Sequence, residues 1–352
     1  MKTIDMTQYG LYDSLSAEAA QYENCYIGRI ISQEKGLYRV ITEGGELIAE
    51  IAGKLRFEVK TPSEFPAVGD FVLLDRINDI HGYGIMSKVL ARKSLFIRKA
   101  AGKTSEEQAI AANIDTALIC MSLNNDFNIH RLERYLSLAW ESGATPIVVL
   151  TKADLCDDIE AKRSAVETVA LGVDILVTTA MAEDGYQKMM QYCKPGMTAT
   201  FIGSSGVGKS TLINRLMNQE YLLTNSLRND DKGRHTTTRR ELILLPNGGM
   251  VIDTPGMREL GMIDISDGLN KGFHDIEALF DGCRFRNCSH TTEPGCAVQA
   301  AIERGDLSQK RFESYQKLKV EAAFSGDKNA YMTEKEKRFK SIAKINKSNH
   351  KK

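Results

Sequence analysis

Residues 203–210 form a glycine-rich segment whose spacing suits phosphate binding. The sequence there reads G-x-x-x-x-G-K-S, between an apolar run at residues 197–202 and a helical pattern at residues 211–216. In such a loop, backbone N–H groups and the helix N-terminus cradle phosphate oxygens, the lysine reaches the terminal phosphates and the hydroxyl binds Mg²⁺. The flanking strand and helix argue against a plain turn with an exposed lysine. The candidate nucleotide-binding residues are Gly203, Ser204, Ser205, Gly206, Val207, Gly208, Lys209, Ser210 and Thr211, with Ser210 also a magnesium ligand.

A second motif has the chemistry to read guanine. Thr151, Lys152 and Asp154 follow an apolar run at residues 146–150. A carboxylate accepts hydrogen bonds from both guanine N1–H and the 2-amino group, whereas adenine offers neither arrangement, so Asp154 is the predicted specificity residue. We expect Lys152 to lie along the base and the Ala180 N–H to meet guanine O6. A T-K-x-D sequence alone is most often a surface turn, but here it accompanies a phosphate loop.

Two further segments are expected to sense the γ-phosphate. Asp253 follows a buried-looking strand and is expected to bind Mg²⁺ through water, while the Gly256 N–H contacts the γ-phosphate and flips when that phosphate leaves. Thr237 lies in a long polar segment and is the favoured ligand to complete the Mg²⁺ shell in the GTP state. Its neighbours Thr236 and Thr238 remain alternatives.

Met257 follows Gly256, at the position where many small GTPases place a glutamine that orients the attacking water. Methionine cannot orient water. His235 is the nearest candidate for this catalytic role, because a neutral imidazole can position water. The alternative is that His235 only caps or packs the switch. Either assignment predicts slow intrinsic hydrolysis that a partner stimulates strongly.

The order of these motifs along the chain is unusual. In an ordinary GTPase the phosphate loop comes first, whereas here Asp154 precedes Gly203 by about fifty residues. The sequence therefore predicts a circularly permuted P-loop GTPase domain, which binds GTP or GDP together with Mg²⁺.

The elements that must position these motifs alternate between strand and helix from about residue 112, the mark of a parallel α/β sheet. Ligands of such sheets bind at the carboxyl ends of the strands, which is where the motifs stand. The predicted strands cover residues 116–121, 146–150, 174–177, 197–202 and 250–252, and a predicted helix covers residues 131–141.

Three cysteines and one histidine cluster near the C-terminus, at Cys283, Cys288, His290 and Cys296. Three thiolates and one imidazole make a closed tetrahedral set suited to Zn²⁺, and with no position left for water the zinc is expected to be structural. The alternative is three reduced cysteines beside a surface histidine.

Short strand patterns separated by turn signals cover residues 26–31, 37–42, 46–51 and 70–75. They predict a five-stranded barrel of OB type, although an SH3-like barrel has a similar pattern. Basic and aromatic residues are interleaved in it, as on an oligonucleotide-binding face, but aromatics in a small barrel are more often core. These residues are Arg29, Arg39, Lys54, Arg56 and Lys60 with Tyr26, Tyr38 and Phe57.

Composition adds limits rather than a function. Of 352 residues, 46 are Lys or Arg and 46 are Asp or Glu, so any RNA contact must come from local patches. No run approaches the ~18 apolar residues of a membrane span and no leader pattern opens the chain, so a cytoplasmic protein is expected. The predicted parts are an N-terminal extension (1–24), the OB-like barrel (25–100), the permuted GTPase domain (101–262) and a zinc-binding helical domain with a basic tail (263–352).

A barrel, a GTPase domain permuted in this order and a C-terminal Cys/His cluster together resemble the RsgA (YjeQ) family of bacterial ribosome-assembly GTPases. The resemblance covers about residues 25–320 and is carried by the phosphate loop and by residues 233–238, 255–261, 285–290 and 294–296. It implies a GTPase that binds the small (30S) ribosomal subunit late in maturation, contacts 16S rRNA with barrel and zinc domain, and is stimulated by that subunit. A monomer is the default expectation.

The resemblance also implies the residue roles given above, including zinc ligation by the cluster and His235 in place of glutamine. Two departures stand out: Thr151 replaces the usual asparagine, and Thr178-Thr179-Ala180 is a loose version of the usual serine-alanine element. The open alternatives are a regulatory GTPase with a protein partner, an RNA-binding scaffold with an idle nucleotide site, and an ATP-driven enzyme, which Asp154 disfavours.

Overall fold

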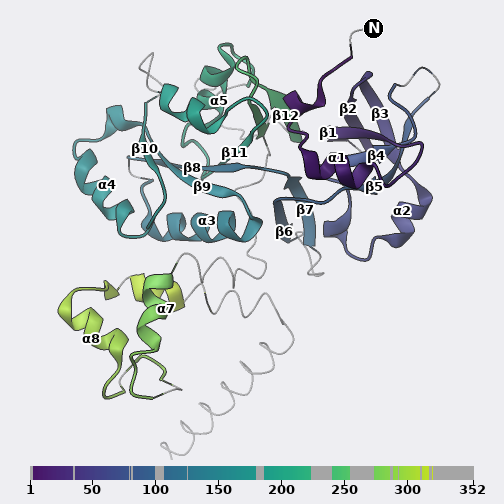
Figure 1. The fold of residues 1–352 in the computed structure, drawn as a ribbon. Coiled ribbons are helices and arrows are strands. Elements are labelled where there is room, and N and C mark those ends of the chain that lie inside the picture. Colours follow the sequence, from purple (N-terminus) through teal and green to yellow (C-terminus); the bar gives the residue numbers. More distant parts are fainter. Residues whose placement is uncertain are drawn as a thin grey trace, which may run out of the picture. The chain divides into compact units, whose positions relative to one another are not determined.

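A computed structural model gives the fold of the chain (Figure 1). It describes residues 3–34, 36–78, 80, 82–99, 107–124, 126–179, 186–222, 240–253, 273–285, 288–291, 293–309, 311–316 and 319. The chain divides into two compact units, Met1–Gly261 and Met262–Lys352. The first unit contains both the predicted barrel and the predicted GTPase segment, and the finer domain borders stay a prediction.

The predicted barrel is present at the start of the first unit. Its strands are β1 (Tyr26–Glu34), β2 (Leu37–Thr42), β3 (Gly45–Ile51), β4 (Phe71–Leu74) and β5 (Gly84–Val89). They close in the order β1-β2-β3-β5-β4, because β1 pairs with both β2 and β4. A helix, α2 (Gly53–Glu58), connects β3 to the 3₁₀ helix η2 (Pro62–Glu64) that precedes β4. This closed five-stranded barrel is of the OB type.

The interior of the barrel leaves no room for a side chain at one position of β1. A Cβ atom added to Gly28 would lie 2.4 Å from a methyl of Val40 and 2.6 Å from one of Leu74. The outer side of the barrel is covered by 3₁₀ helix η1 (Met6–Tyr9) and helix α1 (Asp13–Ala19), whose Leu15 packs with Phe71. The N-terminal segment is therefore part of the barrel's packing.

The predicted parallel sheet follows. Its strands are β8 (Thr116–Ser122), β9 (Thr145–Thr151), β10 (Ile175–Val177), β11 (Thr198–Ile202), β12 (Arg240–Leu244) and β13 (Met250–Asp253). The order across the sheet is β10-β9-β8-β11-β13-β12, and only β12 runs antiparallel to its neighbour in this part of the sheet. Every residue of β8 is buried, as expected for a strand covered on both faces.

Helices cover both faces of this sheet. They are α3 (Ile129–Ser142), α4 (Ile159–Glu167) and α5 (Lys209–Met217), with 3₁₀ helices η3 (Ala153–Leu155) and η4 (Gln187–Tyr192). On β8, Ile119 packs in the cluster that contains Leu136 of α3, whereas Leu118 packs in the cluster that contains Leu212 of α5. Successive side chains of a strand point to opposite faces, so α3 and α5 lie on opposite sides of the sheet (Figure 1).

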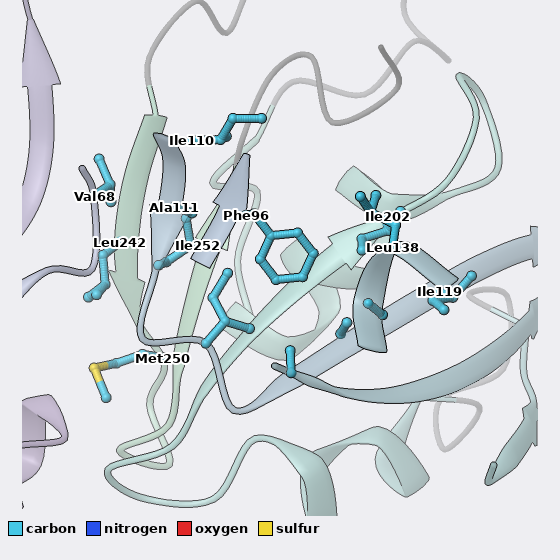
Figure 2. Close-up of a cluster of buried hydrophobic side chains, with 14 of the residues drawn as sticks. Val68, Phe96, Ile110, Ala111, Ile119, Leu138, Ile202, Leu242, Met250 and Ile252 are labelled. Carbon is cyan, nitrogen blue, oxygen red and sulfur yellow. The ribbon is translucent and has the colours of Figure 1, made fainter. Parts of the chain in front are cut away.

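A hairpin that the sequence did not predict joins barrel and sheet along the chain. It consists of β6 (Leu95–Lys99) and β7 (Glu107–Ala112), which pair antiparallel. Figure 2 shows Phe96 of this hairpin in the same buried cluster as Leu138 of α3, Ile202 of β11 and Ile252 of β13. The hairpin therefore contributes to the core of the GTPase sheet.

Barrel and GTPase sheet are directly joined, because β1 also pairs with β12. Beside this junction, the Arg29 side chain is 1% exposed. Its guanidinium donates to the carbonyls of Tyr9, at 2.5 Å, and of Gly69 and Asn113, each at 3.2 Å. It also donates to the hydroxyl of Thr198 on β11, at 2.8 Å. Burial lowers the pKa of Arg29 to about 10, so it stays protonated at neutral pH.

The predicted oligonucleotide-binding face is therefore wrong for two of its residues. Arg29 and Tyr38 are buried in the structure, because the long β1 strand is covered on both sides and Tyr38 belongs to the core. Arg39 is paired with Glu46 and Glu241. Phe57 on α2 is 91% exposed, and Lys54 and Arg56 beside it are exposed as well.

The second unit contains helices α7 (His274–Phe280) and α8 (Ala297–Arg304). Its small core is made of Phe273, Ile276, Val298, Phe312 and Tyr315, together with other buried residues of this unit. Among the residues that the structure describes, no helix is long and apolar enough to cross a membrane.

Candidate nucleotide site and Cys/His cluster

The predicted nucleotide motifs stand at one edge of the sheet. β9 ends at Thr151, β11 ends at Ile202 and β13 ends at Asp253, and these strands are linked through parallel pairings with β8 and with one another. β10 ends at Val177, opposite Leu150 on β9. The carboxyl ends of parallel strands share an edge, so the segments that follow them meet there.

The phosphate loop begins with a close contact that requires glycine. At Gly203, φ is +149°, and an added Cβ would lie 2.4 Å from the backbone oxygen of Cys120 on β8. Gly206 and Gly208 have φ values of +74° and +104°, a region that favours glycine. These three glycines let the chain turn from β11 into α5, which begins at Lys209.

Lys209 is folded back over the loop that it ends. Its Nζ donates to the carbonyls of Gly203 and Ser204, both at 2.7 Å. Ser210 and Thr211 lie in the first turn of α5, where backbone N–H groups lack partners within the helix. The ammonium and the backbone N–H groups of this turn give the segment the donors that a polyphosphate needs.

The guanine-reading motif adopts a strained turn directly after β9. Lys152 has φ +56°, in the left-handed region, and precedes 3₁₀ helix η3. The Thr179 hydroxyl donates to Asp154 Oδ1 at 2.5 Å, and the Thr178 N–H donates to the Leu150 carbonyl at 2.8 Å. The structure thus brings the segments after β9 and β10 together. Thr179 was not among the predicted site residues, although it stands next to Ala180.

Thr151 links the guanine-reading motif to the phosphate loop. Its hydroxyl donates to the carbonyl of Val207 at 2.6 Å, and its side chain is buried. The residue that departs from the usual asparagine therefore makes a direct bond between the two motifs.

Several predicted residues lie outside the described part of the chain, namely Ala180, His235, Thr237 and Gly256. Asp253 is described, as the last residue of β13, opposite Glu241 on β12. What the structure brings together is the segment from Thr151 to Asp154, Thr179 and the phosphate loop.

The four predicted metal ligands of the second unit are close together. The three sulfur atoms and the nearest histidine nitrogen of Cys283, Cys288, His290 and Cys296 all lie within 4.8 Å of one another. His290 Nδ1 is 3.5 Å from Cys283 Sγ and 3.6 Å from Cys296 Sγ. Ligands on a tetrahedral zinc with bonds of about 2.3 Å are separated by roughly 3.8 Å, so these residues fit a metal ion of that kind.

Local structure holds these ligands in place. Cys296 is the N-cap of α8, where its sulfur accepts a hydrogen bond from the Gln299 N–H at 3.5 Å. The Gln299 side chain in turn donates to the His290 carbonyl at 2.7 Å, and the Phe280 ring stacks on His290 with centroids 4.2 Å apart. Burial lowers the pKa of His290, which favours the neutral imidazole that binds metals.

Comparison with known proteins gives consistent matches. The model of the RsgA GTPase family matches residues 89–263. A small ribosomal subunit biogenesis GTPase RsgA 2 from Lactiplantibacillus plantarum is 49% identical over 325 residues, covering 92% of this chain and 91% of the relative. A small ribosomal subunit biogenesis GTPase RsgA 1 from Listeria innocua is 46% identical over 342 residues, covering 96% of each chain.

Two solved structures are similar throughout their length. YjeQ from Thermotoga maritima superposes with a TM-score of 0.62 and 27% identity, covering 85% of this chain and 99% of that chain. YloQ, described as a circularly permuted GTPase, superposes with a TM-score of 0.60 and 27% identity, covering 86% of this chain and 96% of that chain.

Proposed function

The chain belongs to the RsgA family of GTPases, and on this premise we propose that it hydrolyses GTP to GDP and phosphate while bound to the maturing small (30S) ribosomal subunit. The small subunit as partner is inferred from the names of the relatives, and GTP hydrolysis is inferred from the residues of the site. The observation that carries the GTPase assignment is the bond from Thr151 to Val207, which joins a guanine-reading motif to a phosphate loop at one sheet edge.

In this proposal each motif has one task. Asp154 selects guanine, with Lys152 along the base and the Ala180 N–H at O6. The phosphate loop and Lys209 hold the β- and γ-phosphates, and Ser210, Thr237 and Asp253 hold Mg²⁺. When bound, Mg²⁺ neutralises charge that develops on the phosphate oxygens. The Gly256 N–H senses the γ-phosphate, and His235 orients the attacking water.

We also propose that Cys283, Cys288, His290 and Cys296 hold one structural Zn²⁺, and that the protein acts in the cytoplasm as a monomer and contacts 16S rRNA. The donor set supports zinc, because three thiolates and an imidazole leave no coordination position for water. Exposed Phe57, Lys54 and Arg56 on α2 give the barrel a surface with both stacking and charged groups.

Asp154→Asn is expected to change the nucleotide preference of the site from guanine to xanthine. Asparagine presents an amide N–H₂ to the 2-position, where guanine carries a donor and xanthine an acceptor. GDP affinity is expected to fall by about 100-fold or more, while xanthosine diphosphate gains affinity. Competition between the two nucleotides measures the exchange. Asp157→Asn, an exposed aspartate three residues along, removes the same charge and should leave GDP binding intact. An unchanged preference for GDP in Asp154→Asn would reject its role.

The proposed function is tested by steady-state hydrolysis of GTP and ATP, with and without purified small subunits, in the wild type and in His235→Ala. Stimulation by the subunit with GTP only, lost in the variant, is the expected result. Stimulation that survives in the variant would assign water orientation to another group. Absence of multiple turnover under all conditions would reject the GTPase role in favour of an idle nucleotide site.

A further inference from the structure

Asp126, which belongs to none of the nucleotide motifs, attaches the phosphate loop to helix α3. The hydroxyl of Ser204, the second residue of the loop, donates to Asp126 Oδ2 at 2.5 Å. Arg131, in the first turn of α3, donates to Asp126 Oδ1 at 2.8 Å and also to the Asp126 backbone carbonyl. The Asp126 N–H donates to Asn124 Oδ1 at 3.1 Å. One oxygen of the carboxylate is thus bonded to Arg131 of α3, and the other oxygen is bonded to Ser204 of the loop.

The same loop residue is held at a second atom. Lys209 Nζ donates to the Ser204 carbonyl and to the Gly203 carbonyl. Gly203 itself is pressed against the Cys120 backbone of β8. The first turn of the loop therefore contacts strand β8, the Lys209 side chain and the Asp126 carboxylate. The contact to Asp126 is made by the Ser204 side chain, whereas the other contacts involve the backbone of Gly203 and Ser204.

The charge of Asp126 suits this role. Burial works against the charged form, but hydrogen bonds from Ser204 and Arg131 outweigh it and lower the pKa of Asp126, as does the positive charge of Lys152. An ionised carboxylate only accepts hydrogen bonds, so the Ser204 hydroxyl must donate to it and its rotamer is set. The guanidinium of Arg131 offsets the negative charge that would otherwise stand beside a polyphosphate site.

Given the nucleotide binding proposed for residues 203–210, on which this assignment rests, we propose that Asp126 is a positioning residue for GTP and GDP binding. Clamped by Arg131, it holds Ser204 and with it the first turn of the phosphate loop in the conformation that receives the phosphates. This preorganisation lowers the ordering cost of nucleotide binding.

The test is the affinity of purified full-length variants for fluorescent GDP and GTP analogues. Asp126→Ala and Ser204→Ala are each expected to weaken both affinities by about five- to tenfold, through faster dissociation, because each removes the charge-assisted hydrogen bond between Ser204 and Asp126 in a partly exposed site. Asp126→Asn keeps an acceptor and should stay within about twofold of the wild type. The double variant should bind within about twofold of the weaker-binding single variant, since both single changes remove the same bond between Ser204 and Asp126.

Two readouts separate positioning from general damage. KM for GTP should rise by the same factor as the affinity falls, with kcat within about twofold, and nucleotide-free Asp126→Ala should unfold within a few degrees of the wild type. Glu167→Gln is the matched control, because it removes one carboxylate that is paired with an arginine, Arg163, on the surface of the same unit. It should bind GDP as the wild type does.

Other outcomes overturn the assignment in distinct ways. If the wild type binds GDP but Asp126→Ala and Ser204→Ala both match it, the positioning role is wrong and the proposed function stands. Multiplied losses in the double variant would mean that the two residues act separately. A wild type that binds no guanine nucleotide would overturn the proposed function and this role together.

Discussion

Cys288→Ser is expected to abolish the proposed zinc binding and to unfold the second unit. The described core of this unit is small, and its helices α7 and α8 are joined through the Cys283, Cys288, His290 and Cys296 cluster. Small domains commonly need a metal to fold, and structural zinc contributes about 10–16 kcal/mol in finger peptides. Cys288 is only half-buried, so the loss cannot be attributed to an emptied core position.

Metal content by mass spectrometry and limited proteolysis measure this effect. The wild type should contain one zinc per chain, and Cys288→Ser should contain much less and be cleaved rapidly within residues 262–352. A chelator added to the wild type should reproduce the cleavage. Cys156→Ser, a half-buried cysteine of the first unit, exchanges the same atoms and should keep its zinc. Full zinc content with unchanged cleavage in Cys288→Ser would show that the cluster is not the metal site.

The parallel strands of the GTPase sheet could be predicted from sequence because burial on both faces leaves an apolar run, whereas the antiparallel strand β12 (Arg240–Leu244) was not predicted. Residues 146–150 were predicted as a strand, and β9 is Thr145–Thr151. The helix predicted at residues 131–141 begins earlier, at Ile129, because the Asn128 side chain caps it by accepting from the Arg131 N–H. The positions of the strand ends and the types of the residues that follow them were sufficient to predict that the nucleotide motifs share one edge of the sheet.

The β6-β7 hairpin could not be predicted in the same way. Residues 107–112 read E-Q-A-I-A-A, a composition that favours helix by intrinsic propensity. Their strand conformation comes from pairing with β6 and from burial of Ile110 and Ala111 in the core. Tertiary packing overrides local preference here.

Contacts between residues that are far apart in the sequence could not be predicted either. Ser204 was predicted as a phosphate-loop residue, but its bond to Asp126 depends on the approach of α3 to the loop. Arg29 was read as a surface residue because its β-strand pattern does not show that β12 will pair beside it and Thr198 will lie within reach. The Cys/His cluster could be predicted, because its ligands lie close together in the sequence.

Arg29→Met is expected to destabilise the first unit by several kcal/mol, because each buried acceptor left without a donor costs about 1–3 kcal/mol. Arg29 donates to acceptors from separate segments: the N-terminal extension at Tyr9, the barrel at Gly69, and the GTPase segment at Asn113 and Thr198. Methionine fills much of the volume but removes the guanidinium donors from these acceptors, of which the Gly69 carbonyl still accepts from the Asn113 side chain at 3.1 Å.

Urea unfolding followed by fluorescence measures the loss, as a lower urea concentration at the midpoint of unfolding. Arg29→Lys separates charge from geometry. Its single ammonium keeps the charge but cannot present the planar fork of donors, so it too should fall well below the wild type. Arg39→Met is the matched control, because Arg39 lies on the neighbouring strand β2 in partly exposed pairs with Glu46 and with Glu241 of β12. Such pairs contribute about 0–1 kcal/mol, and its midpoint should barely move.

The loss of Arg29 is also expected to change the shape of the unfolding curve. Because Arg29 bonds to both barrel and GTPase segments, its loss should weaken the coupling between them, and a second transition should separate from the first. A variant that unfolds at the wild-type midpoint in one transition would show that the pairing of β1 with β12 and the shared core hold the two parts together without Arg29. If the loss appears as predicted, the buried Arg29 side chain couples the unfolding of the barrel to that of the GTPase sheet.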